Sequence, residues 1–494
     1  MRDTSGTTAR TELLVIGSGF GGLTAAALAA ATDIETCVVE QHLRPGGCAG
    51  DFALEGFWFP AGATVVTGLE PGGILRRVFD AAAIPVAAHE LDPSIVVHAG
   101  GLSVAYSAGV HRWADAVERA FPGVPPGYRR FWEWSHRAGG DMYTVGRALP
   151  AFPIERLSDV RRSAHAISPA ALRAAPLLFR TAGRVKRKFG AAGHAAADAI
   201  IDGMLLDSTG ASAEQCSAAQ AAIALDLYRR GCQWVEGGTG RLAMDLVRSI
   251  RRNGGEVRFR ARVVSLERCP GGWQANLSDG SAIRARRVMA NLPPGALRGL
   301  LGGDRTVPAA REAWSAFVLH LGIDGRGLEE IHPFHQVVEP SRPLHDGGNA
   351  FVSIYRGKGE RSGRWSISVS THTRPGSWRE SDYAPGSARR TQLEEALIGA
   401  VERVIPCVRS RIVVRRSATP RSFERFTLRP DGFVGGLVQR PSNGAQFAAG
   451  HRPAPGIYLA GDHVFPGQGT VGVALSGINA YRDVCDSLKK RALL

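Results

Sequence analysis

Residues 12–40 read ELLVIGSGFGGLTAAALAAATDIETCVVE. A short apolar run leads into the glycine-rich GSGFGG, a run of alanine and leucine that favours a helix follows, and CVVE forms a second apolar run ending in Glu40. This order predicts a strand, a glycine turn, a helix and a second strand. A GxGxxG motif in that setting, with an acid 18 residues after Gly22, is the fingerprint of a dinucleotide-binding site.

Each position of the motif has a physical role. Gly17 permits the tight turn, Gly19 lets a pyrophosphate approach the main chain, and Gly22 lets the helix pack closely on the strand. The free N–H groups at the helix N-terminus supply partial positive charge for the phosphates. Glu40 can accept hydrogen bonds from a ribose, which favours an unphosphorylated ribose and therefore FAD or NAD over NADP.

The segment after Glu40 distinguishes these two dinucleotides. It reads QHLRPGGCAG (41–50), with an arginine and a Gly-Gly pair where flavoproteins wrap their cofactor. An enzyme that passes electrons from NADPH to FAD by the disulfide-reductase plan would need a second strand, GxGxxG and helix unit, and the sequence contains no such unit. We therefore expect FAD.

A second glycine cluster lies near the other end of the chain. IYLAGD (457–462) is typical of a strand, and its Asp462 can hydrogen-bond a ribityl hydroxyl. The following PGQGTVG lets the main chain pass close to a flat ring, and a helix starting at about Val471 would direct its positive end toward the flavin N1 and C2 carbonyl. The bare backbone of this cluster is thus explained by a tricyclic ring lying against it.

The middle of the chain supplies a third piece of the same domain. Residues 237–290 contain a predicted helix (TGRLAMDLVRSIRRN), a Gly-Gly stop and four short runs, EVRFR, RVVSLE, WQANLS and RRVMAN, separated by turn signals. We expect these runs to form a β-meander, with a main-chain group near Val263 bordering the adenine.

Composition limits the classes of function. A chain of 494 residues predicts two or three domains. Its net charge of +15 comes mostly from arginine. This excess reflects either codon bias or attraction of the protein to an anionic surface. Because the sequence has no nucleic-acid-binding motif, we expect that surface to be a membrane and not a nucleic acid. Seven cysteines without a CxxC pair indicate neither disulfides nor a zinc site. With no signal peptide and no long apolar run, we expect a cytoplasmic, peripheral membrane protein.

The whole chain resembles the phytoene desaturase and carotenoid isomerase family of FAD-dependent oxidoreductases, within the amine oxidase superfamily. The resemblance rests on VIGSGFGGLTAAALAA, VVEQHLRPGGCAGDF, GGTGRLAMDLVRSIRRNGGEVRF, TPRSFERFTLRPDGFVGGL and GIYLAGDHVFPGQGTVGVALSGINAYR. One departure is that relatives usually read FDAGP where this chain has FPAGA (59–63). The resemblance implies an enzyme that desaturates or isomerises a hydrophobic polyene by hydride transfer to or from flavin N5. Oxygen or a membrane quinone would reoxidise the flavin after desaturation.

The implied fold is α/β, with a discontinuous Rossmann-like FAD-binding domain of the GR2 type, a mixed-sheet substrate domain and a helical, membrane-facing cap. We expect the FAD domain at 10–75, 232–292 and 440–494, the substrate domain at 76–125 and 293–439, and the cap at 126–231. The residues expected to bind FAD are Gly17, Gly19, Phe20, Gly21, Gly22, Glu40, Gln41, Arg44, Gly46, Gly47, Gly62, Thr64, Val263, Gly461, Asp462, Gly469, Gly472 and Val473.

Residues 175–190, APLLFRTAGRVKRKFG, predict one amphipathic helix. At helical spacing Leu178, Ala182, Val185 and Phe189 share one face, opposite a face of arginines. Such a helix suits a membrane interface, and it equally suits an ordinary surface helix packed on the core.

No catalytic acid or base stands out in the sequence. His463, beside Asp462, is the one candidate side chain, and the spacing of the histidines at 332, 335, 345 and 372 indicates no metal site. Two other functions remain open on this fold. One is a flavin amine or amino-acid oxidase, and the other is a flavin-free isoprenoid-binding escort protein.

Overall fold

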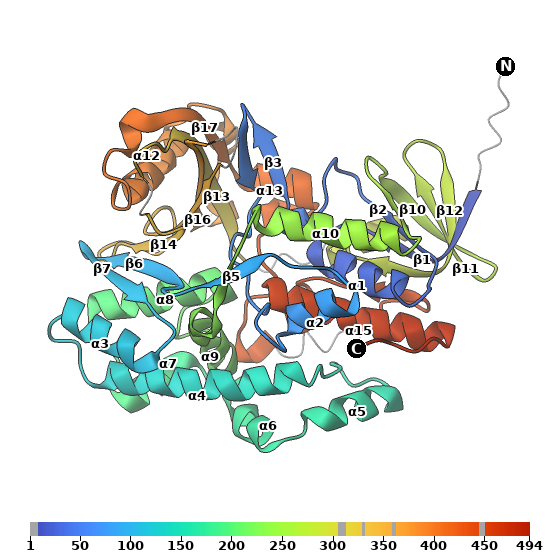
Figure 1. Ribbon diagram of the computed structural model, residues 1–494, viewed down its shortest axis with the longest axis horizontal. Helices are drawn as coiled ribbons and strands as arrows, with labels where there is room; N and C mark the ends of the chain where they lie inside the picture. The colour runs from blue at the N-terminus through green and yellow to red at the C-terminus, as the bar shows by residue number, and fades with distance from the viewer. Residues whose placement is uncertain (1–7, 305–312, 329–330, 358–361, 444–449) are drawn as a thin grey trace.

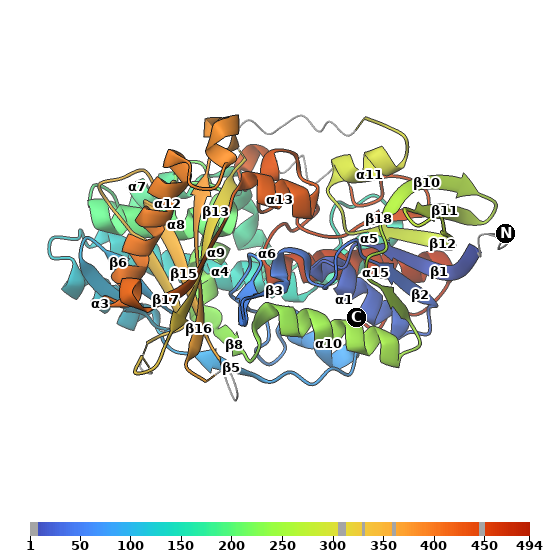
Figure 2. The same cartoon turned by 90° about the horizontal axis from the view of Figure 1, so that it is seen from above.

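Two seven-stranded sheets lie at opposite ends of the molecule, with helices between and below them (Figures 1 and 2). The computed structural model describes residues 8–304, 313–328, 331–357, 362–443 and 450–494. The domain ranges expected from the sequence include residues 305–312, 329–330, 358–361 and 444–449, which lie outside this description.

The first sheet is assembled from three distant parts of the chain. Its strands are β1 (Thr8–Ile16), β2 (Thr36–Val39), β9 (Glu256–Arg258), β10 (Val263–Cys269), β11 (Gly272–Leu277), β12 (Ala282–Ala290) and β18 (Ile457–Leu459). The order is β10-β11-β12-β1-β2-β9, with β18 also paired to β12. β12 and β2 run parallel to β1, and β18 runs parallel to β12.

The predicted meander of four strands is wrong in one strand. β10, β11 and β12 form it, but β9 pairs in parallel with β2 at the opposite edge of the sheet. Its short EVR run follows a helix that returns beneath the sheet, so it continues the parallel, doubly wound part of the fold.

Helices cover one face of this sheet. They are α1 (Phe20–Ala30), α2 (Ile74–Ala81), α10 (Gly238–Arg252) and α15 (Thr470–Leu488). Leu13 and Val15 pack among them, whereas Leu14 and Ile16 point to the other face, where the meander and α11 (Pro294–Leu300) lie. Burial on both faces explains why β1 reads as a continuous apolar run.

The second sheet is mixed. Its order is β17 (Ile412–Ala418), β13 (Ser315–Asp324), β16 (Arg364–Thr373), β15 (Asn349–Arg356), β14 (Phe334–Val338), β6 (Ile95–Ala99) and β7 (Leu102–Tyr106). Only β14 and β6 pair in parallel among these described strands. Helix α12 (Ala388–Glu402) packs on one face. Two small antiparallel sheets lie between the large sheets, together with helix α13 (Pro420–Thr427). One is the hairpin of β3 (Asp51–Leu54) and β4 (Phe57–Pro60), and the other pairs the distant strands β5 (Ala88–Leu91) and β8 (Cys232–Val235).

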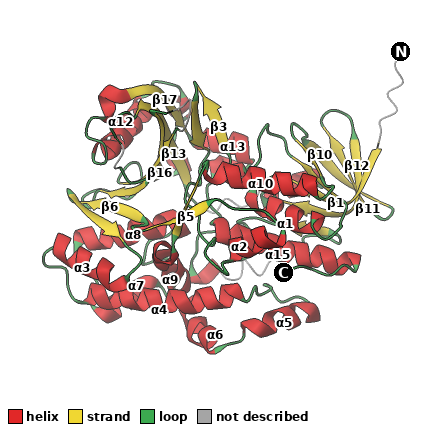
Figure 3. Cartoon of the chain, in the orientation of Figure 1, coloured by secondary structure: helices red, strands yellow, loops and turns green. Residues whose placement is uncertain are grey.

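Helices between residues 110 and 226 form a layer that runs below the second sheet and continues below α15 (Figure 3). They are α3 (Val110–Ala120), α4 (Gly127–Arg147), α5 (Leu157–Ser163), α6 (Pro169–Ala174), α7 (Ala182–Phe189), α8 (Ala195–Thr209) and α9 (Ala218–Asp226). None of the helices in the described part of the chain is long and apolar enough to cross a membrane.

The single helix predicted for residues 175–190 is wrong. A short 3₁₀ helix covers Ala175–Phe179, the chain becomes extended at Arg180, and α7 starts after Thr181, whose hydroxyl accepts a hydrogen bond from the Arg184 N–H. The apolar side chains of α7 pack against the helical core and are not free for a membrane. The helical period was correct over part of the segment, but the N-cap at Thr181 restarts the helix.

Candidate functional site

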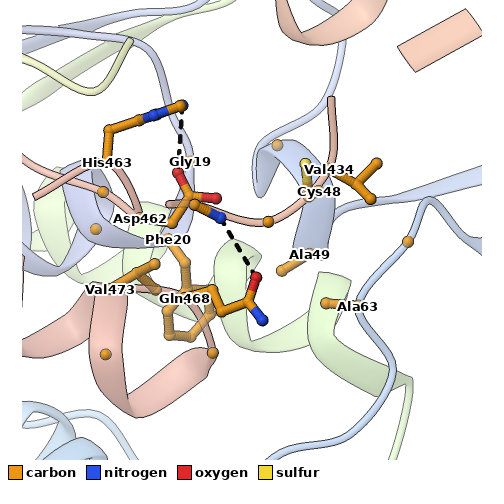
Figure 4. A pocket seen from close by; sticks show the side chains of 18 of the residues that line it. Gly19, Phe20, Cys48, Ala49, Ala63, Val434, Asp462, His463, Gln468 and Val473 are labelled. Atoms are coloured by element: carbon orange, nitrogen blue, oxygen red, sulfur yellow. Dashed lines mark hydrogen bonds and ion pairs between the residues drawn. The ribbon is translucent and has the colours of Figure 1, made fainter. Parts of the chain in front are cut away.

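A cavity of about 970 Å³ runs from the glycine turn after β1 to the second sheet. The two glycine clusters predicted from the sequence meet in its wall, and Figure 4 shows Gly19 and Phe20 near Asp462 and Val473. All of the eighteen residues expected to bind FAD line this cavity except Gly22 and Arg44.

Gly22 and Arg44 lie outside the cavity wall, where each makes other contacts. A Cβ on Gly22 would lie 2.8 Å from the Gly17 carbonyl oxygen, so this glycine permits the close packing of helix on strand. Arg44 donates a 2.7 Å hydrogen bond from Nε to Asp51, and its guanidinium lies 4.5 Å from the centre of the Trp58 ring. Through these contacts Arg44 stabilises the loop that contains Gly46 and Gly47.

Glu40 is held in place by the glycine turn. Its Oε2 accepts hydrogen bonds from the main-chain N–H and the hydroxyl of Ser18 at 2.8 and 2.7 Å, and its Oε1 accepts one from the His42 N–H at 2.9 Å. The carboxylate is therefore fixed at the end of β2 and still has lone pairs for a ribose hydroxyl.

Two helices begin at this cavity without a side-chain cap. α1 starts after Gly19 and α15 starts after Gly469, and neither first turn is closed by a side chain. Uncapped N-terminal N–H groups suit an anionic ligand such as a pyrophosphate or a reduced ring. The two helices are in direct contact, because a Cβ on Gly477 would lie only 2.4 Å from the main-chain oxygen of Gly21.

Asn291 connects the two ends of the chain and was missed in the sequence. It follows β12 and donates a 2.8 Å hydrogen bond from Nδ2 to the carbonyl oxygen of Ala460. Its Oδ1 lies 2.2 Å from where a Cβ on Gly19 would be, so position 19 has to be glycine for this contact. An asparagine directly after an apolar strand was the available signal.

Asp462 has an arginine partner that was also missed. Arg429 Nη2 donates a hydrogen bond of 2.8 Å to each carboxylate oxygen of Asp462. The side chains of Arg429 and Asp462 are only 10% and 16% exposed. Burial alone would raise the pKa of Asp462, but the adjacent Arg429 guanidinium outweighs it and holds this pKa below its usual value. Asp462 is therefore an anion at neutral pH, with one lone pair on each oxygen left for a ribityl hydroxyl.

His463 lines the cavity beside this ion pair. Its Nε2 lies 3.8 Å from Asp462 Oδ1 and has no hydrogen-bond partner among the described residues. Burial lowers the pKa of His463 to about 4, against the opposing effect of Asp462. The imidazole is neutral at pH 7, and a catalytic role for it stays a prediction.

Beyond the cofactor loops, the cavity has a mostly apolar arm. Helices α4, α8 and α9 and the second sheet contribute its lining, which includes Met142, Val145, Leu206, Ile223, Leu227, Val318 and Phe351. Of the four histidines noted in the sequence, His372 also lines this arm, whereas His332, His335 and His345 do not.

Comparisons with known proteins agree with this geometry. The model of the family "flavin containing amine oxidoreductase" matches residues 20–485. A chloroplastic prolycopene isomerase of Daucus carota is 25% identical over 96% of this chain and 80% of its own. A lycopene-forming phytoene desaturase of Paracoccus sp. is 28% identical over 63% of this chain and 62% of its own.

Solved structures of amine oxidases share the fold. Putrescine oxidase bound to putrescine superposes with a TM-score of 0.64 at 14% identity, covering 98% of this chain and all of that one. Cyclohexylamine oxidase from Brevibacterium oxydans has a TM-score of 0.62 at 14% identity, covering 97% and 99% of the two chains. Because the family model spans nearly the whole chain and the two glycine clusters in the cavity wall fit the cofactor, this chain belongs to the flavin containing amine oxidoreductases and is an FAD-dependent oxidoreductase.

Proposed function

We propose that the protein desaturates or cis/trans-isomerises a hydrophobic polyene of the carotenoid type. The observation that supports this most directly is the apolar arm of the cavity, which continues from the cofactor loops between α4, α8, α9 and the second sheet. The names of the relatives that align over most of the chain, prolycopene isomerases, point to the same class of substrate.

The FAD would be held by the residues that line the cofactor end of the cavity. The α1 N-terminus would face the pyrophosphate, Glu40 would accept a hydrogen bond from the ribose, and Asp462 would accept one from the ribityl chain. When bound, FAD supplies a hydride acceptor or donor at N5. The N-terminus of α15 would stabilise negative charge on the ring, and the apolar arm would exclude water from the reacting part of the polyene.

A membrane is the natural source of such a substrate, because moving a hydrocarbon into water costs roughly 0.8 kcal/mol per CH₂ group. Eight large apolar side chains are exposed between residues 152 and 179, namely Phe152, Ile154, Leu157, Val160, Ile167, Leu172, Leu178 and Phe179. We call them the 152–179 patch. Its most exposed members, Leu157 and Phe179, are 78% and 79% exposed.

The position of the 152–179 patch supports membrane loading. α5 and α6 lie at the lower edge of the molecule in Figure 1, and Pro150, which lines the cavity, comes two residues before Phe152 in the sequence. Exposed arginines at 156, 161 and 180 accompany the apolar side chains, whereas Arg173 is ion-paired with Asp141. Many exposed apolar side chains in one segment, accompanied by arginines, are typical of a surface that binds anionic lipid. We therefore propose that the peripheral membrane contact lies on this patch, and not on α7.

The direct test is expression in cells that make phytoene and lycopene isomers. The proposal predicts a yellow protein with FAD bands and a cell extract whose polyene has a shifted spectrum or a changed isomer composition. A shifted absorption maximum identifies desaturation, whereas a changed isomer ratio at constant conjugation identifies isomerisation. FAD bands together with unchanged pigment would contradict the proposal.

One observation favours a second function, an amine oxidase. Asp207 places a carboxylate in the wall of the arm, where it could attract a cationic amine, and the similar solved structures include amine oxidases. Peroxide release on addition of long-chain or small amines would support this function. The escort protein is disfavoured, because the residues that fit FAD are intact.

A further inference from the structure

The apolar arm contains one pair of ionisable side chains that face each other from separate elements. Asp207 lies in the last turn of α8 and His372 lies near the end of β16. His372 Nδ1 is 3.4 Å from Asp207 Oδ1, each side chain is 18% exposed, and both line the cavity. The polyene reaction proposed above assigns no role to this pair.

Asp207 is fixed by two buried amides from the second sheet. Asn349 Nδ2 donates to Asp207 Oδ1 at 2.9 Å, and Gln336 Nε2 donates to Asp207 Oδ2 at 3.1 Å. Both amide side chains come from residues that are 1% exposed, and Gln336 Nε2 also contacts Asn349 Oδ1 at 3.1 Å. Because each carboxylate oxygen receives an N–H, Asp207 is held as an oriented acceptor.

The carboxylate of Asp207 faces Nδ1 of His372 at 3.4 Å. In the neutral ring, a proton on Nδ1 would point to this acceptor, and Nε2 would carry the lone pair. Nothing in the described part of the chain is hydrogen-bonded to Nε2. The Trp314 ring meets the imidazole edge-on, with centroids 6.0 Å apart, and limits its rotation.

We infer that the Asp207–His372 pair binds a hydroxyl group on an otherwise apolar, isoprenoid ligand. A pure hydrocarbon lying over Nε2 would leave a buried acceptor without a donor, which is unfavourable. An alcohol O–H donates to Nε2, whereas an ether or an aldehyde at the same place has no proton to donate. This inference rests on the proposed function, since it specifies the substrate of the same cavity.

The test is the binding of three matched probes to the FAD-containing protein in detergent micelles, measured by titration calorimetry. The probes are geranylgeraniol, its methyl ether and geranylgeranylamine. We expect the alcohol to bind about tenfold more tightly than the ether, which is the effect of one satisfied hydrogen bond. Expressing each result as a ratio between variants cancels the partition of the probes into micelles.

Two variants and a control locate the effect. His372→Leu should reduce the alcohol-to-ether ratio to about one, and Asp207→Asn should reduce it several-fold because the tautomer is no longer fixed. His345→Leu is the matched control: His345 also packs on Trp314, at 5.7 Å, but bonds Asp346 and does not line the cavity. It should keep the wild-type ratio.

The outcomes separate this inference from the proposed function. Equal binding of alcohol and ether to the wild type, which needs no variant to fold, overturns the hydroxyl site but leaves the apolar cavity intact. Tighter binding of the amine than of the alcohol overturns the inference in favour of an amine substrate. Failure of all three probes to bind overturns the proposed function as well.

Discussion

Replacing Arg429 by methionine should strongly destabilise the cofactor end of the cavity. Arg429 contacts both carboxylate oxygens of Asp462 at 2.8 Å in a largely buried pair. Removing one partner of a buried ion pair leaves the other charge uncompensated, which costs about 3–5 kcal/mol. We expect the free energy of unfolding to fall by about that amount, and the affinity for FAD to fall with it because Asp462 loses its orientation.

The same variant has a predictable pH dependence. The folded-state pKa of Asp462 is depressed, so the pair's contribution to stability is fully present above the unfolded-state pKa of about 3.9 and is lost as the pH falls through the folded value. The difference in stability between the wild type and Arg429→Met should therefore be constant at neutral pH and shrink below about pH 4.

Urea unfolding at several pH values, followed by flavin and tryptophan fluorescence, measures both effects. The double variant Arg429→Met with Asp462→Asn should recover most of the lost stability, because it removes both charges together. Arg421→Met is the matched control, since its pair with Glu380 is exposed and should matter little. If Arg429→Met were no more destabilising than Arg421→Met, the reasoning about the buried pair would be refuted.

Two further substitutions test the packing of the cofactor site and the membrane surface. Gly477→Ala places a Cβ 2.4 Å from a main-chain oxygen of α1, so it should lower the free energy of unfolding by about 1–3 kcal/mol and release FAD. Gly399→Ala in α12, with open space around its Cβ, is the control and should be neutral or stabilising. Thermal unfolding and flavin content measure both effects, and equal behaviour of the two variants would refute the contact. Replacing Leu157 and Phe179 together by Glu should abolish flotation of the protein with phosphatidylglycerol vesicles without loss of FAD. The control Val413→Glu, at an exposed apolar position on the second sheet, should leave flotation unchanged. Unchanged flotation of the double variant would place the membrane contact elsewhere.

Local patterns in the sequence predicted the two glycine-rich segments that meet at the cofactor end of the cavity, but not the pairing of β9 with β2. The glycine turn, Glu40 and the Gly461–Asp462 cluster each depend on a few consecutive residues whose backbone requirements are visible in the sequence. These segments meet at one cavity as expected.

Contacts between distant residues were not predictable in the same way. Arg429 meets Asp462 across 33 positions, and Asp207 meets His372 only because α8 packs beside the second sheet. The helical period at 175–190 did not distinguish an apolar face that packs on the core from one that meets lipid, since both bury the same kind of side chain. No local pattern reports which of these occurs.

The most direct test of the central claim is anaerobic incubation of the FAD-containing protein with polyenes in anionic vesicles. Flavin absorbance and the chromatographic profile of the polyene would be recorded together. We expect either bleaching of oxidised flavin with a longer conjugated product, which is desaturation, or a changed isomer ratio that requires reduced flavin, which is isomerisation. A flavin that bleaches with amines and leaves every polyene unchanged would contradict it.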